Sequence, residues 1–507
     1  MIRAEEAPQR AWDQLLAVRH QLPHSAWAPA LAYQGIDLVE GLLNPLYQAL
    51  LAAERGHQPT PPGAPTHRRI AAALHRLLLQ RRSPDRVARW LARRRSARPA
   101  AASVCFWPRE ITHLEVQIPV ARALHQRGVE ATWVAGSPHL AQALHRHKIP
   151  SLFPVAAWPE ALAAARRWGE GMGESLAREP GVPLPHEPVV RRTLRQQLPV
   201  AAGATATALG IATTVRPRVL VVGNDLTLEG RLGTLVAQAR GIATAALMHG
   251  LVSAEPMHGQ HRVDRFLVYG EGSRRLLLER GTPAERIAVT GCPKLDPPPR
   301  QEGRVHPQLA RRLGLRAGEP WILIAFSGPG HSVSHDHHRR LIEAVGQCSA
   351  ALPGVRFVAR LHRKDAPEPY REILNRIPGA RLTVVRHGQR GYPTAIFDWL
   401  QGCRAVITGA STVAVEAMLL EVPVITLDLT GELATTDFIT AGATLHGTSP
   451  ETLVRRVEGV LQGDLGGTVE TARRFARETF HQPDEGAVAR AAQSIENLIP
   501  EDWRNDG

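Results

Sequence analysis

The sequence predicts an α/β protein with two doubly wound domains and a helical region at its N-terminus. Short apolar runs rich in β-branched residues alternate with amphipathic helical segments from about residue 101 onward. The same alternation restarts after a proline cluster at Pro297–Pro299. The runs end in loops of glycine, small hydroxyl and charged residues, and the carboxyl ends of strands are where such sheets bind ligands.

Six apolar runs in the first half of the chain are expected to form one mostly parallel sheet. They cover residues 102–107, 129–136, 218–225, 243–250, 265–270 and 286–293. Helical segments such as 114–128, which ends at a glycine, lie between them. Connections of this length join parallel strands, so the pattern predicts β-α-β units.

Five further runs predict a second sheet of the same kind. They cover residues 321–328, 355–362, 381–388, 404–410 and 422–429. The proline cluster before them is a natural hinge. The expected organisation is a helical extension over residues 1–98, a first Rossmann-like domain over 99–296 and a second over 297–507.

The first 98 residues favour helices because apolar residues recur three and four positions apart, as in 11–22 and 70–80. A proline-rich linker, residues 56–69, separates these segments. The segment Arg81–Arg98 is rich in arginine and predicts a very basic helix, with either a solvated face or a face that meets anionic lipid or a phosphorylated acceptor. The uncharged stretch Gln196–Val215 is expected to be a helix of a soluble protein.

Composition limits the classes of function. The 507 residues carry a formal net charge of +14. Such a charge favours binding to polyanions, but it also fits a chain that is simply rich in arginine. Aromatic residues make up 5% and are not interleaved with basic ones, so no nucleic-acid partner is expected. Four dispersed cysteines and the lack of a visible secretory signal fit a cytoplasmic protein.

One predicted strand end, at residues 409–416, has the features of a phosphate and ribose site. Gly409, Ser411 and Thr412 stand where an apolar run gives way to a helix. Hydroxyl side chains there can cap backbone N–H groups, and a helix N-terminus can receive an anion. Glu416 follows about one turn later, where a carboxylate can accept hydrogen bonds from ribose hydroxyls. The alternative is an ordinary helix cap.

A second strand end, after residue 326, adds to the same expectation. Ser327, Gly328 and Gly330 follow an apolar run and precede a helix. Val333 occupies the third glycine position of a G-x-G-x-x-G pattern, so a single monophosphate or diphosphate is expected rather than a dinucleotide.

Cationic residues follow a third strand end, and histidines crowd the second. His362 and Lys364 offer hydrogen-bond donors that suit phosphate oxygens. The histidines have only Asp336 as an acidic neighbour and no cysteine, so no metal site is expected. The histidines in question are His331, His335, His337 and His338.

The loops of the first domain carry acids and bases instead of phosphate-binding groups. Glu110 and His113 follow the first run, and Asp225 follows the third. We expect one of these three to be the general base that acts on an acceptor hydroxyl. Further polar candidates in these loops are Arg109, Asn224, Glu229, His249 and His258.

Three stretches of the chain, 266–296, 360–365 and 397–425, resemble enzymes of bacterial surface-carbohydrate synthesis with the GT-B fold. That group includes capsule glycosyltransferases, glycerophosphotransferases and the UDP-N-acetylglucosamine 2-epimerases. The resemblance extends over about 101–498. Family members often have His-Pro where this chain has His362 followed by Arg363, and epimerases have an Asp-Ser-Gly-Gly loop where it has Gly409-Ala-Ser-Thr.

The resemblance implies a metal-independent glycosyltransferase that takes a nucleotide-activated sugar as substrate, with no further cofactor. The second domain would hold the nucleotide, and the first would face a saccharide or lipid-linked acceptor. A protein of this kind would be cytoplasmic, with an anionic membrane surface as a further partner. The alternatives are a polyol-phosphate (CDP-glycerol type) transferase, a UDP-sugar 2-epimerase and a non-catalytic polyanion-binding protein.

Overall fold

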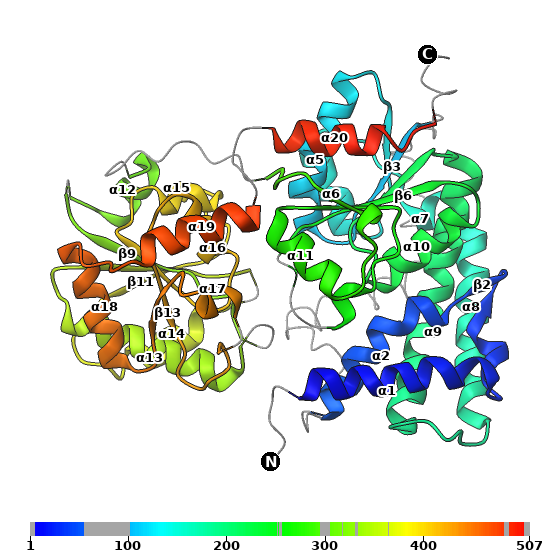
Figure 1. Cartoon of the computed structure of the whole chain (residues 1–507), viewed down its shortest axis with the longest axis horizontal. Helices are drawn as coiled ribbons and strands as arrows, with labels where there is room; N and C mark the ends of the chain where they lie inside the picture. The colour runs from blue at the N-terminus through cyan, green and yellow to red at the C-terminus, as the bar shows by residue number, and fades with distance from the viewer. Residues whose placement is uncertain are drawn as a thin grey trace, which may run out of the picture. The chain divides into compact units, whose positions relative to one another are not determined.

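The computed structural model describes residues 6–54, 102–250, 252, 256–294, 305–316, 318–329, 333–363, 365–434, 436–480 and 486–500. The chain forms two compact units. The first comprises Met1–Lys294 and Glu485–Gly507, and the second comprises Leu295–Asp484. The expectation of two Rossmann-like α/β domains is confirmed, because each unit contains a six-stranded parallel sheet with helices around it (Figure 1).

The sheet of the first unit contains all six strands that the sequence predicts. Its order is β4-β3-β5-β6-β7-β8, and every neighbouring pair is parallel. Both β3 and β5 are buried over their whole length, as expected when helices cover both faces of a sheet. The strands are β3 (Val104–Trp107), β4 (Ala131–Trp133), β5 (Val219–Val222), β6 (Ala243–Leu247), β7 (Arg265–Val268) and β8 (Ile287–Val289).

The helices around this sheet include α20, which comes from the far C-terminal part of the chain. They are α5 (Ile111–Gln126), α6 (Pro138–Arg146), α7 (Pro154–Ala157), α10 (Leu228–Gln238), α11 (Glu271–Glu279) and α20 (Ala487–Glu496). Helix α20 lies beside α5 (Figure 1), where Ala491 and Ile495 enter the core of the first sheet and Arg127 pairs with Glu496 at 2.9 Å. The sequence assigned residues 297–507 to one domain, whereas the last segment packs in the first unit.

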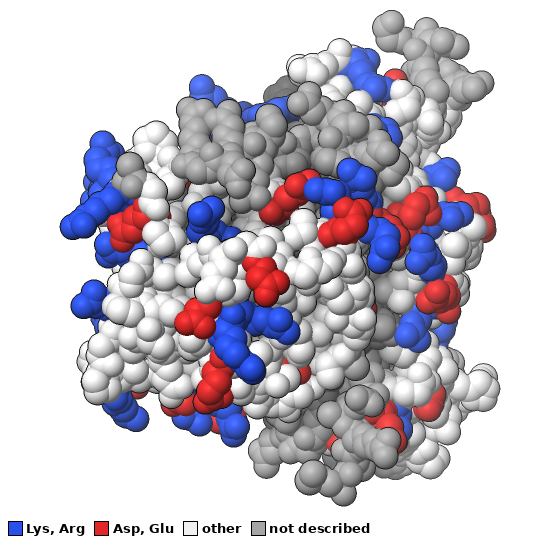
Figure 2. Space-filling model, turned by 60° about the vertical axis from the view of Figure 1, so that its left-hand side comes forward, with Lys and Arg blue, Asp and Glu red and all other residues white. Residues whose placement is uncertain are grey.

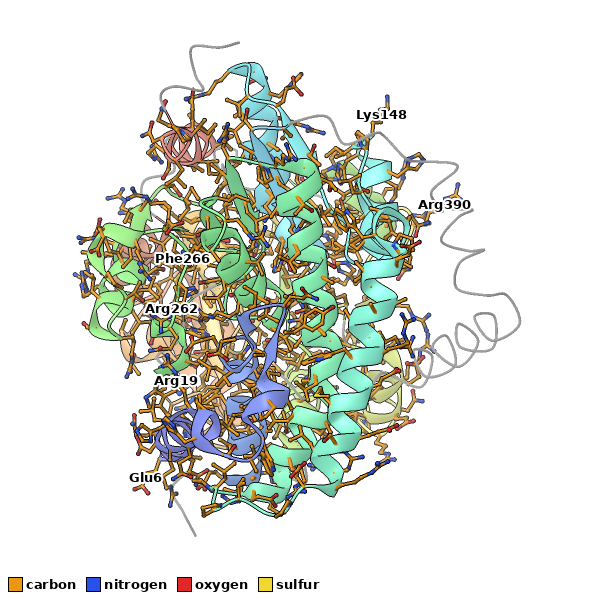
Figure 3. The ribbon with its side chains drawn as sticks, turned by 90° about the vertical axis from the view of Figure 1, so that its right-hand side faces the viewer. Glu6, Arg19, Lys148, Arg262, Phe266 and Arg390 are labelled. Atoms are coloured by element: carbon orange, nitrogen blue, oxygen red, sulfur yellow. The ribbon has the colours of Figure 1, made fainter. Side chains whose placement is uncertain are left out.

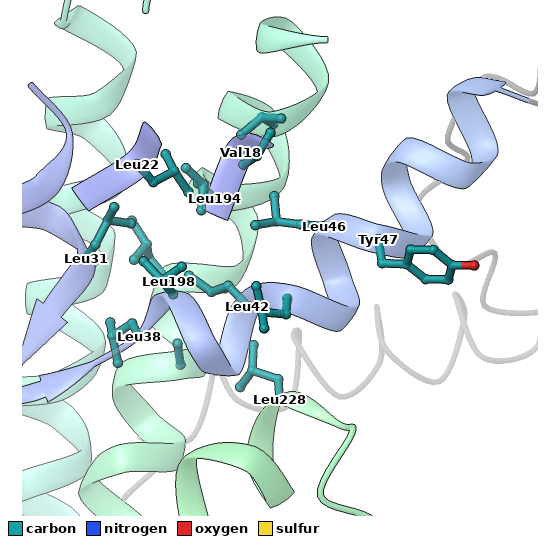
Figure 4. Packing of buried hydrophobic residues seen from close by; sticks show 14 of the residues in the cluster. Val18, Leu22, Leu31, Leu38, Leu42, Leu46, Tyr47, Leu194, Leu198 and Leu228 are labelled. Atoms are coloured by element: carbon teal, nitrogen blue, oxygen red, sulfur yellow. The ribbon is translucent and has the colours of Figure 1, made fainter. Parts of the chain in front are cut away.

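A layer of four helices extends the first unit. It consists of α1 (Ala7–Gln21), α2 (Val39–Glu54), α8 (Pro159–Arg178) and α9 (Glu187–Gly210), with a small hairpin of β1 (Ala32–Tyr33) and β2 (Ile36–Asp37). Leucines of all four helices share one core, in which Leu42, Leu46, Leu194 and Leu198 meet Leu228 of α10 (Figure 4). The N-terminal helices are thus part of the first unit's core. The predicted linker and basic helix at Arg81–Arg98 lie outside the described residues.

Helix α9 crosses the middle of this layer and continues into a π-helical turn, η3 (Ile211–Val215). The predicted helix at Gln196–Val215 is confirmed. A Cβ atom at Gly169 of α8 would lie 2.5 Å from Cα of Pro199 in α9, so glycine permits the two helices to cross closely. Among the described helices, only Glu187–Val215 is long and apolar enough to span a membrane, but 61% of that apolar window is buried against the protein.

The sheet of the second unit has the order β11-β10-β9-β12-β13-β14 and is parallel throughout. Five of its strands match predicted runs. The sixth, β14, has three residues and none is β-branched, so the sequence did not indicate it. The strands are β9 (Trp321–Ile324), β10 (Arg356–Arg360), β11 (Leu382–Val385), β12 (Ala405–Thr408), β13 (Val424–Leu427) and β14 (Leu445–Gly447).

Helices form two layers around this second sheet. Helix α13 packs against α14 and α18, whereas α16 packs against α15 and α19. The helices are α12 (Pro307–Leu313), α13 (His335–Ala351), α14 (Pro367–Leu374), α15 (Ile396–Leu400), α16 (Val413–Leu419), α17 (Asp437–Thr440), α18 (Pro450–Gln462) and α19 (Thr468–Phe480).

The charge of the chain is distributed over its surface. On the face shown in Figure 2, basic side chains lie among acidic ones and form no continuous field. Helix α13 gives an example, because Asp336 pairs with both Arg339 and Arg340 at its exposed N-terminal turns. Such pairs offset much of the local positive charge, so the net charge of +14 does not by itself mark a polyanion-binding face.

We expect Leu15→Ala to lower the free energy of unfolding of the first unit by about 2–5 kcal/mol, because it leaves a cavity in the helical layer. Leu15 is 0% exposed. Its neighbour Leu16 on the same helix is 41% exposed and provides the control, since Leu16→Ala should change stability by less than about 0.5 kcal/mol. Chemical denaturation of the full chain measures both. Equal effects of the two substitutions would contradict the described packing of α1.

Candidate functional site

The switch point of the second sheet lies between β9 and β12, where the order of strands reverses. The loops that follow these strands are tied together. The Ser327 hydroxyl donates to the carbonyl of Ala410 at 3.3 Å, and the Thr408 hydroxyl donates to the carbonyl of Ala325 at 2.6 Å. The structure therefore brings Ser327 to the loop of Gly409.

The loop after β10 joins the same place through Gly328. This residue has φ +78°, a conformation that favours glycine, and a Cβ atom there would lie 3.3 Å from Cβ of Asp365. His362, at the end of β10, is half-buried. Gly330, Lys364 and His331 lie outside the described residues, so their part in the site stays a prediction.

The loop after β12 carries Ser411 and Thr412 immediately before α16. The Ser411 hydroxyl accepts from the backbone N–H of Val413 at 3.4 Å, a weak cap. The Thr412 side chain makes no capping hydrogen bond, and its backbone is already helical, so its expected contact with phosphate stays a prediction. Glu416 is only 5% exposed on α16, and its contact with ribose stays a prediction.

Asp365 holds the loop after β10 in place, and the sequence analysis did not single it out. Its carboxylate accepts from the backbone N–H of Ala366 and from the Tyr370 hydroxyl, both at 2.9 Å, and lies 3.3 Å from Nε2 of His338. Burial and then the nearby Asp365 raise the pKa of Tyr370 well above its usual value. The hydroxyl therefore stays protonated and remains a donor to the carboxylate.

A second carboxylate cluster fixes the loop after β13. Asp428 accepts from the backbone N–H groups of Gly431 at 2.8 Å and Leu433 at 3.0 Å. The imidazole Nδ1 of His337 lies 2.7 Å from the Thr430 hydroxyl and 3.8 Å from Glu432. These contacts give the buried histidines of α13 structural partners. Among the described residues, no three His, Cys, Asp or Glu side chains are grouped for a metal ion.

The switch point of the first sheet lies between β3 and β5, and His113 lies there at the start of α5. Its Nδ1 accepts from the backbone N–H groups of Arg109 at 3.1 Å and Glu110 at 3.4 Å. His113 is 2% exposed, whereas Glu110 is exposed. Arg109 extends toward Glu229 of α10, with 3.5 Å between the charged atoms.

Asp225, after β5, lies in a different environment from the other two base candidates, because it is 0% exposed. One carboxylate oxygen is 2.5 Å from Nδ1 of His261, and the other accepts from the backbone N–H groups of Arg262 at 2.6 Å and Val263 at 3.1 Å. Arg231 lies 3.8 Å away. Asp225 therefore fastens the chain before β7 to the end of β5.

Opposing effects act on the pKa of Asp225. Burial raises it, but the charge and hydrogen bond of His261, followed by Arg231 and the N–H of Arg262, outweigh burial and hold the pKa well below its usual value. A carboxylate with a lowered pKa and occupied oxygens is a weak proton acceptor. That Asp225 acts as the general base stays a prediction, and its contacts with His261, Arg231 and Arg262 do not favour it.

The N-terminal helices reach this anchor through Glu40 of α2. Glu40 pairs with Arg19 of α1 and lies 3.7 Å from Arg262. Arg19, Arg262 and Phe266 accordingly follow one another along one side of the first unit (Figure 3). Arg231 donates a hydrogen bond to the carbonyl of Gln260, which immediately precedes His261. The helical layer thus contacts the segment that carries His261.

His249, two residues beyond β6, completes the carboxyl edge of the first sheet. Its ring centroid lies 4.2 Å from that of His113 at an interplanar angle of 66°. His249 is one of the polar loop residues named from the sequence, but it was not among the three candidates for the general base. His249 follows the predicted strand β6, and Asp225 follows its neighbour β5. This position at a strand end is the feature of the sequence that could have identified His249.

The family model described as UDP-N-acetylglucosamine 2-epimerase matches residues 261–495. A crystal structure of a putative UDP-N-acetylglucosamine 2-epimerase from Listeria monocytogenes aligns over 79% of this chain and 98% of its own, at 18% identity and a TM-score of 0.52. A further UDP-N-acetylglucosamine 2-epimerase structure aligns over 80% and 97%, at 16% identity and a TM-score of 0.51. This likeness shows that the chain has the two-domain, GT-B-like fold of these structures. No curated protein sequence matches it.

The segment matched by the family model, residues 261–495, covers parts of both units. It begins at His261 and contains the last strands of the first unit, the whole second unit and most of α20. The N-terminal helices and the loops of His113 and Asp225 precede it. The GT-B fold therefore accounts for both sheets, while α1 and α2 stand outside the family match.

We expect Asp225→Asn to lower the free energy of unfolding at pH 7 by about 3–5 kcal/mol, because it leaves the buried Arg231 without its counter-charge. The folded pKa of Asp225 lies below the unfolded value of about 3.9, so its stabilising effect is present above that pH and declines as the pH falls toward the folded pKa. Chemical denaturation at pH 7 and pH 3 should show a smaller difference between variant and wild type at pH 3.

The matched control is Asp13→Asn, which alters an exposed aspartate of α1. This variant should differ from the wild type by less than about 0.5 kcal/mol at both pH values. A loss for Asp225→Asn that is the same size as for Asp13→Asn would contradict the anchoring role of Asp225.

Proposed function

We propose that the protein is an enzyme that acts on a nucleotide-activated sugar, with 2-epimerisation of a UDP-sugar as the reaction. The observation that carries the proposal is the meeting of three strand ends in the second unit, within the stretch matched by the epimerase family model. The Ser327 hydroxyl, the backbone of Gly328 and the loop from Gly409 to Thr412 offer small, donor-rich groups there. Such groups suit a nucleotide diphosphate.

The charges around these loops support the same ligand. Arg363 follows His362 after β10, and neither side chain is buried. A cation beside the phosphates would offset the negative charge that grows on a departing nucleotide. The nucleotide sugar is itself the substrate in this proposal, so no resident cofactor is needed.

Glycosyl transfer is the second candidate, and one observation favours it. The loop after β12 reads Gly409-Ala-Ser-Thr instead of the Asp-Ser-Gly-Gly expected of an epimerase. A transferase would use the same nucleotide site and pass the sugar to a saccharide or lipid-linked acceptor. Its setting would be the cytoplasm, with the basic segment at Arg81–Arg98 as a means of reaching an anionic membrane.

Incubation of the full chain with UDP-N-acetylglucosamine alone separates the candidates. Proton NMR should show the 2-epimer forming without an acceptor if the protein is an epimerase. Nucleotide binding without conversion, followed by transfer once an acceptor is added, would favour the transferase. A panel of UDP, CDP, CMP and GDP with their sugars, in which no compound raises the melting temperature, would overturn both.

We expect the double variant Ser411→Ala, Thr412→Ala to weaken nucleotide binding by about 1–3 kcal/mol, the scale of hydrogen bonds to a charged group. Calorimetric titration with the nucleotide that most stabilises the wild type measures it. Thr471→Ala on α19 is the control, because its hydroxyl donates to the carbonyl of Gly467 and its position lies outside the loops after β9, β10 and β12. Unchanged affinity of the double variant would exclude Ser411 and Thr412 from the phosphate site.

A further inference from the structure

Two imidazole rings meet at the carboxyl edge of the first sheet. His113 comes from the start of α5 after β3, and His249 comes from the loop after β6. Strand β5 lies between β3 and β6, and its exit residue, Gly223, lies under the His113 ring. Three neighbouring strand ends therefore contribute to one arrangement, with ring centroids 4.2 Å apart.

The hydrogen bonds of His113 fix its tautomer. Its Nδ1 accepts from the backbone N–H groups of Arg109 and Glu110. A ring nitrogen that accepts hydrogen bonds carries no proton, so the neutral imidazole carries its proton on Nε2. The ring is 2% exposed, and protonation at Nδ1 would break both of these hydrogen bonds.

Gly223 determines where the His113 ring can lie. A Cβ atom at position 223 would lie 1.9 Å from Nδ1 of His113 and 2.5 Å from its Cε1. Any side chain at 223 would displace the imidazole. The ring is therefore held by backbone donors at the start of α5, by the backbone at the end of β5 and by contact with His249.

We propose that His249 is the catalytic residue that accepts a proton from the sugar substrate, and that His113 is the positioning residue that holds it. This inference rests on the proposed function. His249 is half-buried at the edge where parallel sheets bind ligands, whereas His113 and Asp225 are almost fully enclosed.

The proton transfer is balanced within the site. A ring nitrogen of His249 forms a new N–H bond with its lone pair while the O–H or C–H bond of the sugar breaks. The electron pair of the broken bond stays on the sugar, where it drives the next step of the reaction. The imidazolium ion then releases the proton to the product or to solvent, and His249 is restored.

The tautomer is tested by NMR of the full chain labelled with ¹⁵N-histidine. The signals of His113 are identified by their loss in His113→Asn. We expect Nδ1 of His113 without a proton and Nε2 with one. A proton on Nδ1 would overturn the positioning role. The Asn variant retains an acceptor near the place of Nδ1, so it keeps the bonds to the backbone while removing the ring that contacts His249.

The catalytic role is tested with UDP-N-acetylglucosamine as the probe, plus an acceptor if the protein proves to be a transferase. We expect His249→Gln to lower kcat by about 10²–10⁴-fold with KM within threefold of the wild type. His113→Asn should lower kcat by a smaller factor, also without a change in KM. His145→Gln on α6, an exposed histidine of the same unit, should leave kcat unchanged.

Chemical rescue separates catalysis from structural damage. Imidazole added to His249→Ala should restore part of the lost turnover, and the melting temperature should stay within a few degrees of the wild type. Wild-type kcat in His249→Gln, with an active wild type, would overturn this inference alone. A wild type that turns over no nucleotide sugar would overturn the proposed function and, with it, the role of His249, while the NMR measurement would still decide the tautomer.

Discussion

Parallel pairing of the strands is the constraint on which the rest of the structure depends. Every hydrogen-bonded pair in both six-stranded sheets runs parallel, so each connection must cross back over a face of its sheet. The crossings supply the helices that bury both faces. They also bring every strand end to one edge, which places Ser327 beside Ala410 in one unit and His113 beside His249 in the other.

This constraint explains why the fold was readable from the sequence. Runs such as 219–222 and 405–408 are apolar and β-branched because they are buried on both sides, and that pattern is visible without a structure. Strand β14 was not readable, since Leu445–Gly447 is short and pairs only with the edge of β13. The extent of the helical layer was hidden as well, because α1 packs on α2, and α2 finds its further partners in α9 and α10, far along the chain.

The site was less readable because strand ends do not reveal where a side chain points. Asp225 has the sequence context of a general base, yet its partner His261 lies 36 positions away and turns it into an internal anchor. His113 has the same context, and its hydrogen bonds to the backbone at 109 and 110 occupy the nitrogen that a base would use. Three-dimensional contacts, rather than residue type, distinguish these roles.

The return of α20 to the first unit has a consequence for how this enzyme class diversifies. The chain leaves the first unit after Lys294 and comes back at Glu485, so the second unit is one uninterrupted insertion. A recombination event with two breakpoints, one at each junction, would replace the whole second unit and leave the core around α5 and α20 intact. Exchange of the second unit would thus change one sheet without rebuilding the other, provided that the two junctions are preserved.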